Sequence, residues 1–396
     1  MSVINQRARS LILGSATIDA LALGLYLASA GLFLAVVIGM SPSTVGIVLG
    51  VGGTAGMVGA VPIARLTERF DAARVLAMLF IARGCAFLAF AAVRDPLSAA
   101  VVVTAAGFLN RGIGPILQSI ALEGADRAVQ VDILARLRAL RNVGIGLGGV
   151  PVGFVLAADS PLGFRFMVAA AGVIAGAAAV LSLMLPRAPA PTTPTARGSS
   201  RRARVETAFV RLTVTYGFLT MSGIVLGLGL PLLIVESGGI PRWTVGAIQV
   251  GNTVIVVALQ VAFSRGSERV TRARRMLAAG GVTTAGGCLL MLLLTQTTGA
   301  VGVALVAACI VVFTAAELLA SAGGAGMMLS FVPPMERAGY LAVFNLGFAG
   351  ATVAGPPLVG LAVTHQPWSW AVLALVFLVV AGAALTLPAG GFAGDD

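Results

Sequence analysis

Long apolar segments separated by short polar loops follow one another along almost the whole sequence. Those with the length of a membrane-spanning helix lie near residues 10–38, 43–64, 74–93, 97–122, 139–158, 162–185, 208–234, 243–264, 275–296, 299–323, 339–363 and 369–388. A bilayer core about 30 Å thick needs about 20 helical residues, and backbone polar groups in lipid must be paired within the segment. The pattern therefore predicts an all-α membrane protein with twelve transmembrane helices.

One long polar segment interrupts this pattern. Residues 186–206 are rich in proline, threonine and arginine, and they separate the first six apolar segments from the last six. Such a composition is typical of a flexible linker. We therefore expect an N-terminal six-helix bundle at 1–185, a cytoplasmic linker at 186–206 and a C-terminal six-helix bundle at 207–396.

The two halves repeat each other in sequence. Thr44-Val-Gly46 recurs as Thr244-Val-Gly246, and Asn142-Val-Gly144 recurs as Asn345-Leu-Gly347. Between these matches, the loop residues Arg65, Glu68, Arg69 and Arg74 recur as Arg265, Glu268, Arg269 and Arg274. The matches keep their order and their place relative to the apolar segments. They predict two pseudo-symmetric bundles, as in transporters whose halves rock about a central site.

Composition and charge agree with a membrane protein. Hydrophobic residues make up 58% of the chain and charged residues only 10%, well below the roughly 25% of soluble domains. The net charge of +11 does not indicate nucleic-acid binding, because the arginines are concentrated in short loops. With both termini inside, 21 arginines are cytoplasmic, including Arg141, and only Arg94, Arg165 and Arg242 are outside. This asymmetry predicts a multi-pass protein of the cytoplasmic membrane with cytoplasmic termini.

The sequence offers little for a metal site or for catalysis. His365 is the single histidine, and the three cysteines lie far apart within apolar segments. We therefore expect no metal, no cofactor and no enzymatic activity. The expected partners are a small-molecule substrate, protons and the lipid bilayer, with no nucleic acid, and we expect a monomer.

Several motifs resemble those of a known transporter family. The loop 64–74 (ARLTERFDAAR) is similar to the signature between helices 2 and 3 of the major facilitator superfamily. Arg111-Gly-Ile-Gly114, the glycine-rich stretch 144–153, the Gly355-Pro356 pair and the loop 333–340 resemble elements of its proton-coupled drug exporters. The resemblance covers the whole chain. It implies the twelve-helix fold of that superfamily, with helices 1, 4, 7 and 10 around a central cavity, and activity as a drug:proton antiporter.

Ionisable residues within membrane spans are candidates for function, because their burial in lipid is costly. Asp19 lies about nine residues into the first span, roughly 14 Å deep. Arg111 lies in the fourth span and Glu317 in the tenth. We expect Asp19, Arg111 and Glu317 to couple transport to protons, with Arg111 close to Asp19. The alternative is a permanent Asp19–Arg111 ion pair that only locks helices together. Arg83, in the third span, is expected to have a structural role, and contact with the substrate is the alternative.

Polar residues at helical spacing in the spans are candidates for a substrate cavity. They are Tyr26, Gln118, Tyr216, Thr220, Gln249, Asn252 and Asn345. Hydrogen bonding between helices explains such residues equally well. For the repeated loops, the resemblance implies that Glu68 and Arg69 latch the halves on the cytoplasmic side. We extend this gating role to Arg74, Glu268 and Arg269. The alternative is that these residues have no gating role and only contribute to the positive charge usual in cytoplasmic loops.

The scarcity of embedded charges favours export of a small apolar or amphipathic molecule, such as a drug or secondary metabolite, in exchange for protons. A proton-coupled symporter for nutrient uptake is the main alternative. Sugar carriers usually have aromatic residues in their cavity, whereas Trp243, Trp368 and Trp370 lie near span ends, where we expect interface anchors. A membrane scaffold would need neither the repeated loops nor the embedded charges.

Overall fold

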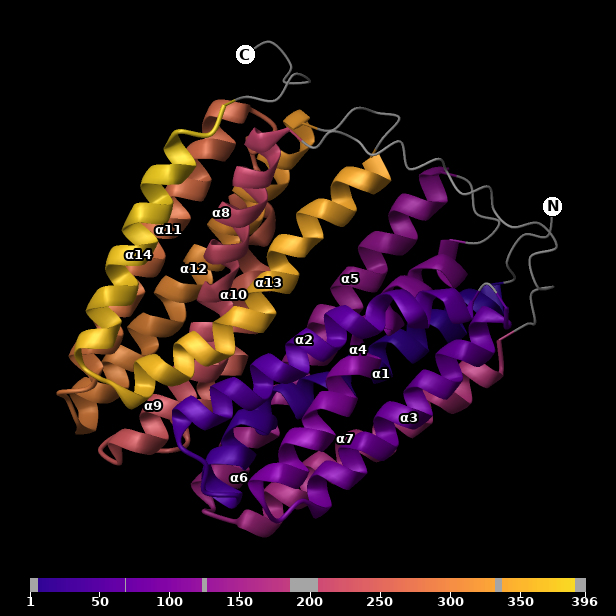
Figure 1. The fold of residues 1–396 in the computed structure, drawn as a ribbon, viewed down its shortest axis with the longest axis horizontal. Helices are drawn as coiled ribbons and strands as arrows, with labels where there is room; N and C mark the ends of the chain where they lie inside the picture. Colours follow the sequence, from indigo (N-terminus) through magenta and orange to yellow (C-terminus); the bar gives the residue numbers. More distant parts are fainter. Residues whose placement is uncertain (1–5, 68, 123–126, 186–205, 332–336, 389–396) are drawn as a thin grey trace. The chain divides into compact units, whose positions relative to one another are not determined.

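The computed structural model describes residues 6–67, 69–122, 127–185, 206–331 and 337–388, and all regular elements within them are helices (Figure 1). In the first half these are α1 (Gln6–Leu32), the π-helical turn η1 (Phe33–Val37), α2 (Pro42–Leu66), α3 (Ala72–Ala92), α4 (Pro96–Leu122), α5 (Arg127–Gly149), α6 (Pro151–Ala157) and α7 (Pro161–Leu183). In the second half they are α8 (Thr207–Ile224), the π-helical turn η2 (Val225–Gly229), α9 (Leu230–Ser237), α10 (Thr244–Ser264), α11 (Val270–Leu294), α12 (Gly299–Phe331), α13 (Arg337–Thr364) and α14 (Trp368–Leu385).

The prediction of twelve transmembrane helices is confirmed: the described residues contain 12 helical segments long and apolar enough to cross a membrane. The first combines α1 with η1, the fifth combines part of α5 with α6, and the seventh combines α8, η2 and α9. Two ends differ from the prediction by five residues or more. The ninth span begins at Val270 and the tenth continues to Phe331. The additional residues of the ninth span include Thr271, Arg272 and Arg274, which hydropathy excludes from a span, whereas residues 324–331 of the tenth span are largely apolar.

The helices fall into two compact units. The first unit comprises Met1–Met40 and Val48–Gly198, and the second comprises Ser41–Ile47 and Ser199–Asp396. The main division falls in the segment expected to be a linker, of which residues 186–205 lie outside the described residues. The exception is the beginning of α2, which is grouped with the second unit.

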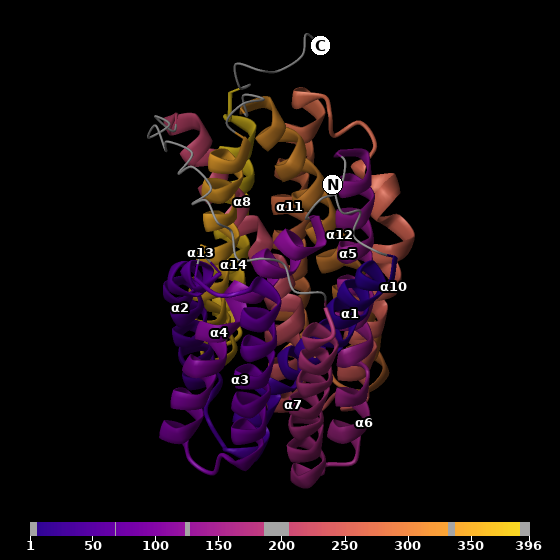
Figure 2. The same cartoon turned by 90° about the vertical axis from the view of Figure 1, so that its right-hand side faces the viewer.

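Both units use the same helix pairs. In the first unit α1 packs against α5, and α3 packs against α4 and α7; Figures 1 and 2 show α3 and α7 side by side. In the second unit α8 packs against α13, and α11 packs against α12 and α14. These contacts join equivalent spans of the two halves, so the sequence repeat is also a repeat of packing.

The repeated glycines lie where these helices pack closely. A Cβ atom added to Gly144 on α5 would be 2.7 Å from the Cβ of Ala20 on α1. A Cβ atom added to Gly347 on α13 would be 2.3 Å from the backbone oxygen of Thr213 on α8. Both distances are too short for a side chain, as expected for closely packed membrane helices. The Asn-x-Gly repeat therefore marks the same helix–helix contact in both units.

The tryptophans only partly fit the expectation of interface anchors. Trp243 and Trp368 are exposed, but Trp370 is fully buried in the second unit. The end of its ring lies close to Gly229, where an added Cβ would be 3.4 Å away. Trp370 is thus a packing residue, because two positions along α14 rotate it by about 200° from the exposed Trp368.

Candidate functional site

An ion pair joins three helices inside the first unit. Asp19 on α1 accepts a hydrogen bond through Oδ1 from Nη2 of Arg83 on α3. Arg83 donates a second bond through Nη1 to Oδ1 of Asn110 on α4, at 3.0 Å. The side chains of Asp19 and Arg83 are 0% and 1% exposed. The expected Asp19–Arg111 pair is therefore wrong: the partner of Asp19 is Arg83.

The geometry of α4 explains why Arg111 is not the partner. Successive residues of an α-helix are rotated by about 100° around its axis. Asn110 faces Arg83, so Arg111 faces a different side. Its stem runs along α2, where a Cβ atom added to Gly56 would be 3.0 Å from Cγ of Arg111. Arg111 is half-buried there.

Aromatic rings enclose this ion pair. The guanidinium of Arg83 lies 5.5 Å from the ring centre of Phe87 and 5.7 Å from that of Phe80. Tyr26 stacks on Phe87 with ring centres 4.4 Å apart and meets Phe90 edge-on. Tyr26 is buried. It therefore belongs to the interior of the first unit, contrary to the expectation that it lines a cavity.

The second unit holds its embedded acid differently. Asn252 on α10 donates through Nδ2 to Oε2 of Glu317 on α12, at 3.2 Å, and to Oγ1 of Thr314, at 3.1 Å. Glu317 and Asn252 are half-buried. Among the described residues, no guanidinium is paired with Glu317. Gly223 of α8 faces the carboxyl, with its Cβ position 3.9 Å from Cδ of Glu317. The structure thus brings together two of the predicted site residues, Asn252 and Glu317.

The other predicted cavity residues are not joined to this cluster by hydrogen bonds. Tyr216 on α8 is half-buried and stacks on Phe344 of α13, with ring centres 4.4 Å apart. The hydroxyl of Thr220 donates to the backbone oxygen of Gly217, which is a bond within its own helix. Gln249 is half-buried, and Gln118 and Asn345 are exposed. Their assignment to a substrate cavity stays a prediction.

Two residues of the first unit were missed or misplaced by the sequence analysis. Asn110 was missed, although a polar residue directly beside Arg111 in an apolar span was a usable signal. Arg141 was counted as cytoplasmic. It lies inside the fifth span, Ala139–Ala157, and is half-buried. Its Nη1 is 3.6 Å from the Cβ position of Gly114 on α4.

The predicted gating residues lie in exposed loops and helix ends. Arg69, Arg74, Glu268 and Arg269 are exposed, and Glu68 lies outside the described residues. The backbone N–H of Arg74 donates to Oδ2 of Asp71, which caps the beginning of α3. The latch role of these residues stays a prediction.

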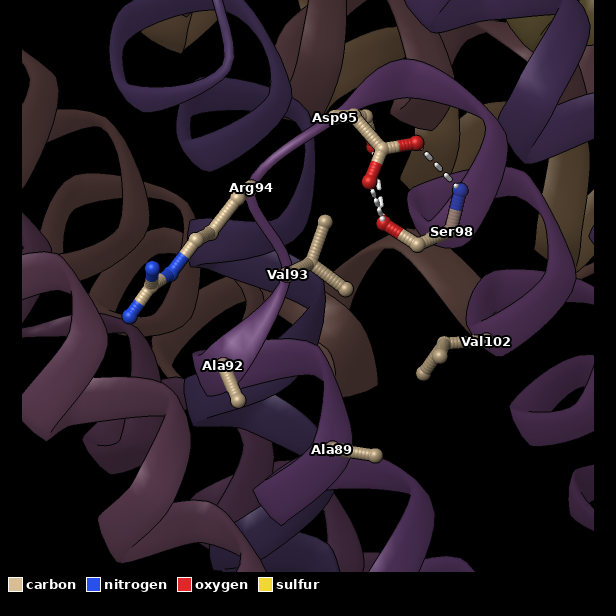
Figure 3. A pocket seen from close by; sticks show the side chains of 7 residues that line it. All are labelled: Ala89, Ala92, Val93, Arg94, Asp95, Ser98 and Val102. Atoms are coloured by element: carbon tan, nitrogen blue, oxygen red, sulfur yellow. Dashed lines mark hydrogen bonds between the residues drawn. The ribbon is translucent and has the colours of Figure 1, made fainter.

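A shallow hollow of about 360 Å³ lies at the connection between α3 and α4 (Figure 3). Its walls include Arg94, Asp95 and Ser98, and Asp95 turns towards Ser98 while Arg94 points away. Asp95 accepts bonds from the backbone N–H groups of Leu97 and Ser98 and from the Ser98 hydroxyl. The bonds from Ser98 lower the pKa of Asp95. Because these bonds cap the beginning of α4, we assign Asp95 a structural role.

Comparison with known proteins identifies the fold. The Major Facilitator Superfamily model matches residues 12–316. The nucleoside transporter NupG is 14% identical, with a TM-score of 0.73 over 96% of this chain and 98% of that one. A bacterial homolog of the human lysosomal transporter Spinster is 13% identical, with a TM-score of 0.76 over 98% of this chain and 97% of that one.

An auto-inhibited peptide transporter of the POT family is also 13% identical, with a TM-score of 0.76 over 98% of this chain and all of that one. These identities are low, so the likeness concerns the fold alone. A search against curated proteins finds no significant match.

Proposed function

This chain belongs to the Major Facilitator Superfamily, and on that basis we propose that it exports a small apolar or amphipathic molecule in exchange for protons. The chain is a multi-pass membrane transporter of twelve spans. In the proposed cycle its two halves expose the substrate site alternately to the two sides of the cytoplasmic membrane, with both termini in the cytoplasm.

The environment of Glu317 is the observation that carries the proposal of proton coupling. Its carboxyl is half-buried in a membrane span, and its hydrogen-bond partner is the neutral amide of Asn252. A carboxylate without a cationic partner is costly in such surroundings, and protonation removes the charge. Glu317 is therefore able to change charge without breaking an ion pair.

We assign Glu317 the following part in the cycle. It takes up a proton when the transporter is open to the outside and the substrate leaves. It releases that proton when the transporter is open to the cytoplasm and new substrate binds. One proton then moves inwards for each substrate molecule that moves outwards.

The ion pair of Asp19 and Arg83 supports a different assignment. Each charge has its counter-charge at hydrogen-bond distance, and both side chains are excluded from solvent. Titrating Asp19 would leave the guanidinium of Arg83 buried without its partner, which is strongly unfavourable. We therefore propose that this pair holds α1, α3 and α4 together, and that Glu317, with Arg111 in the other unit, carries the coupling.

Everted membrane vesicles test the direction and the coupling together. The vesicles are prepared from a bacterial host that lacks its own multidrug exporters and are energised to acidify the lumen. A panel of neutral, cationic and anionic amphipathic dyes is then added. We expect at least one dye to accumulate in the lumen and to dissipate the proton gradient, measured with a pH-sensitive fluorophore.

Variants of matched chemistry complete the test. Glu317→Gln should abolish both signals, whereas Glu236→Gln, an exposed residue at the end of α9, should preserve them. Dye uptake that persists in Glu317→Gln vesicles would refute the role of Glu317. Gradient-driven movement of a nutrient out of the vesicle lumen, with no dye accumulation, would favour the uptake symporter.

A further inference from the structure

The membrane spans of the first unit contain more positive than negative charge. Asp19 is the single acidic residue within its six spans, which also contain Arg83, Arg111 and Arg141. Asp19 is bonded to Arg83. The unit therefore has no second carboxylate within its spans to neutralise Arg141.

Arg141 is the third residue of the fifth span, Ala139–Ala157. It precedes Gly144 by three residues, which is about 4.5 Å along α5. Gly144 packs against Ala20 and against the backbone oxygen of Thr17, on either side of Asp19. Arg141 is thus within about one helical turn of the level of the buried ion pair.

Within the described part of the chain, no protein group satisfies this guanidinium. Among the described residues, Arg141 has neither a hydrogen-bond acceptor nor an ion-pair partner. Arg83 is close enough for the two like charges to interact. A half-buried cation that is repelled by its neighbour and lacks an acceptor is costly within a membrane span, and such residues mark substrate or ion pathways.

The face of α4 next to Arg141 carries further hydrogen-bond donors. Gly114 leaves the space that the guanidinium occupies. Arg111 and Gln118 lie three residues before and four residues after Gly114, on the same face of α4. Arg111 is half-buried and Gln118 is exposed. Two guanidiniums and an amide thus border one region of the first unit.

We infer that the transported molecule carries an anionic group, a carboxylate or a phosphate, and that Arg141 binds it with Arg111 and Gln118 alongside. A guanidinium presents two parallel N–H donors that match the oxygens of either group. This inference rests on the proposed function and narrows its substrate to an amphipathic anion. The bound anion supplies a counter-charge for Arg141 that the six spans of the first unit do not.

Binding to the purified full-length protein in an uncharged maltoside detergent tests this inference. The probes are octanoate, octyl phosphate, octanol and octylammonium, which share one alkyl chain and differ in charge. Thermal unfolding is followed by tryptophan fluorescence, because a ligand that binds the folded state raises the melting temperature. We expect one or both anions to stabilise the wild-type protein more than octanol or octylammonium does.

Three variants test whether the stabilisation by anions depends on Arg141. Arg141→Gln should weaken anion binding roughly tenfold or more, since it removes charge-assisted hydrogen bonds. Arg94→Gln, an exposed loop variant with the same change in net charge, should bind as the wild type does. Arg141→Lys keeps the charge but not the paired donors, so it should show intermediate affinity. If Arg141→Gln does not fold, the Lys variant decides: wild-type affinity in it overturns the assignment.

Two further outcomes would overturn the inference. One is a wild-type protein that neither anion stabilises beyond octanol. The other is an Arg141→Gln variant that keeps the full stabilisation by the anions. The measurement involves neither a proton gradient nor transport. Its failure therefore leaves the vesicle test of proton-coupled export standing, and failure of the vesicle test leaves this measurement standing.

Discussion

The two units share their helix packing but treat an embedded carboxyl in opposite ways. In the first unit, Asp19 is fully buried and bonded to Arg83, which in turn is bonded to Asn110. In the second unit, Glu317 is half-buried and bonded to the neutral amide of Asn252. An asparagine thus takes part in both clusters, but only the first contains a matching cation.

This difference separates a structural charge from a functional one. Breaking a buried ion pair leaves one charge without compensation, so both members are fixed in their ionised forms. A half-buried carboxyl held by an amide has no such constraint. The two units therefore share their helix packing, whereas the charge state of each cluster depends on which side chains lie opposite the embedded carboxyl.

The largest expected effect on stability comes from breaking the ion pair of the first unit. Asp19→Asn or Arg83→Gln should destabilise the protein by about 3–5 kcal/mol, because each leaves a buried charge alone. The double variant should be more stable than either single variant. Glu317→Gln should change stability by less than about 1 kcal/mol. Unfolding in detergent measures all four; similar losses for Asp19→Asn and Glu317→Gln would abolish the contrast.

The two asparagines sharpen the comparison further. Asn110→Ala and Asn252→Ala each remove one hydrogen bond to a charged group, worth about 1.5–3 kcal/mol. We expect similar losses of stability but different losses of function. After correction for the amount of folded protein, proton-coupled transport in vesicles should be retained in Asn110→Ala and reduced in Asn252→Ala. Equal transport in the two variants would contradict the separate roles of the clusters.

The shared packing is tested at a repeated glycine. Gly347→Ala should cost about 1–3 kcal/mol, because the added methyl group meets the backbone oxygen of Thr213. Gly350→Ala on the same helix is the matched control, because no atom lies within 4 Å of its Cβ position. Thermal unfolding of both variants gives the answer. A neutral Gly347→Ala variant would mean that α8 and α13 are less closely packed than described.

The smallest effect is expected at Asp95, an exposed carboxyl outside the spans. Its folded-state pKa is lowered by hydrogen bonds from Ser98. Because folding lowers this pKa, the hydrogen bonds to the ionised carboxylate stabilise the folded state above the usual aspartate pKa. That stabilisation is lost as the pH falls through the folded-state pKa of Asp95. The melting temperature of Asp95→Asn should therefore depend slightly less on pH below about 4 than that of the wild type. Superimposable profiles would show that the cap contributes nothing measurable.

Much of the fold was predictable, because transmembrane hydropathy is a local property of the chain. Each span is long and apolar by itself, so all twelve were identified without knowledge of their neighbours. The correspondence of Gly144 and Gly347 was also visible as a repeat. The beginning of the ninth span was not predicted, because Thr271, Arg272 and Arg274 continue the helix although they are polar. The end of the tenth span was not predicted either, although residues 324–331 are largely apolar.

The sequence by itself determined the class of the protein, its spans, its repeat and the short set of embedded charges. Only the tertiary structure decided how those charges are paired. Asn110 and Arg111 are neighbours in sequence and equally polar, but a rotation of about 100° directs the first towards Arg83 and the second towards α2. The predicted fifth span already contained Arg141, but only the tertiary structure placed its guanidinium beside Gly114 of α4. Pairing depends on the rotation and depth of each helix relative to its neighbours, which are set by side-chain packing between distant segments.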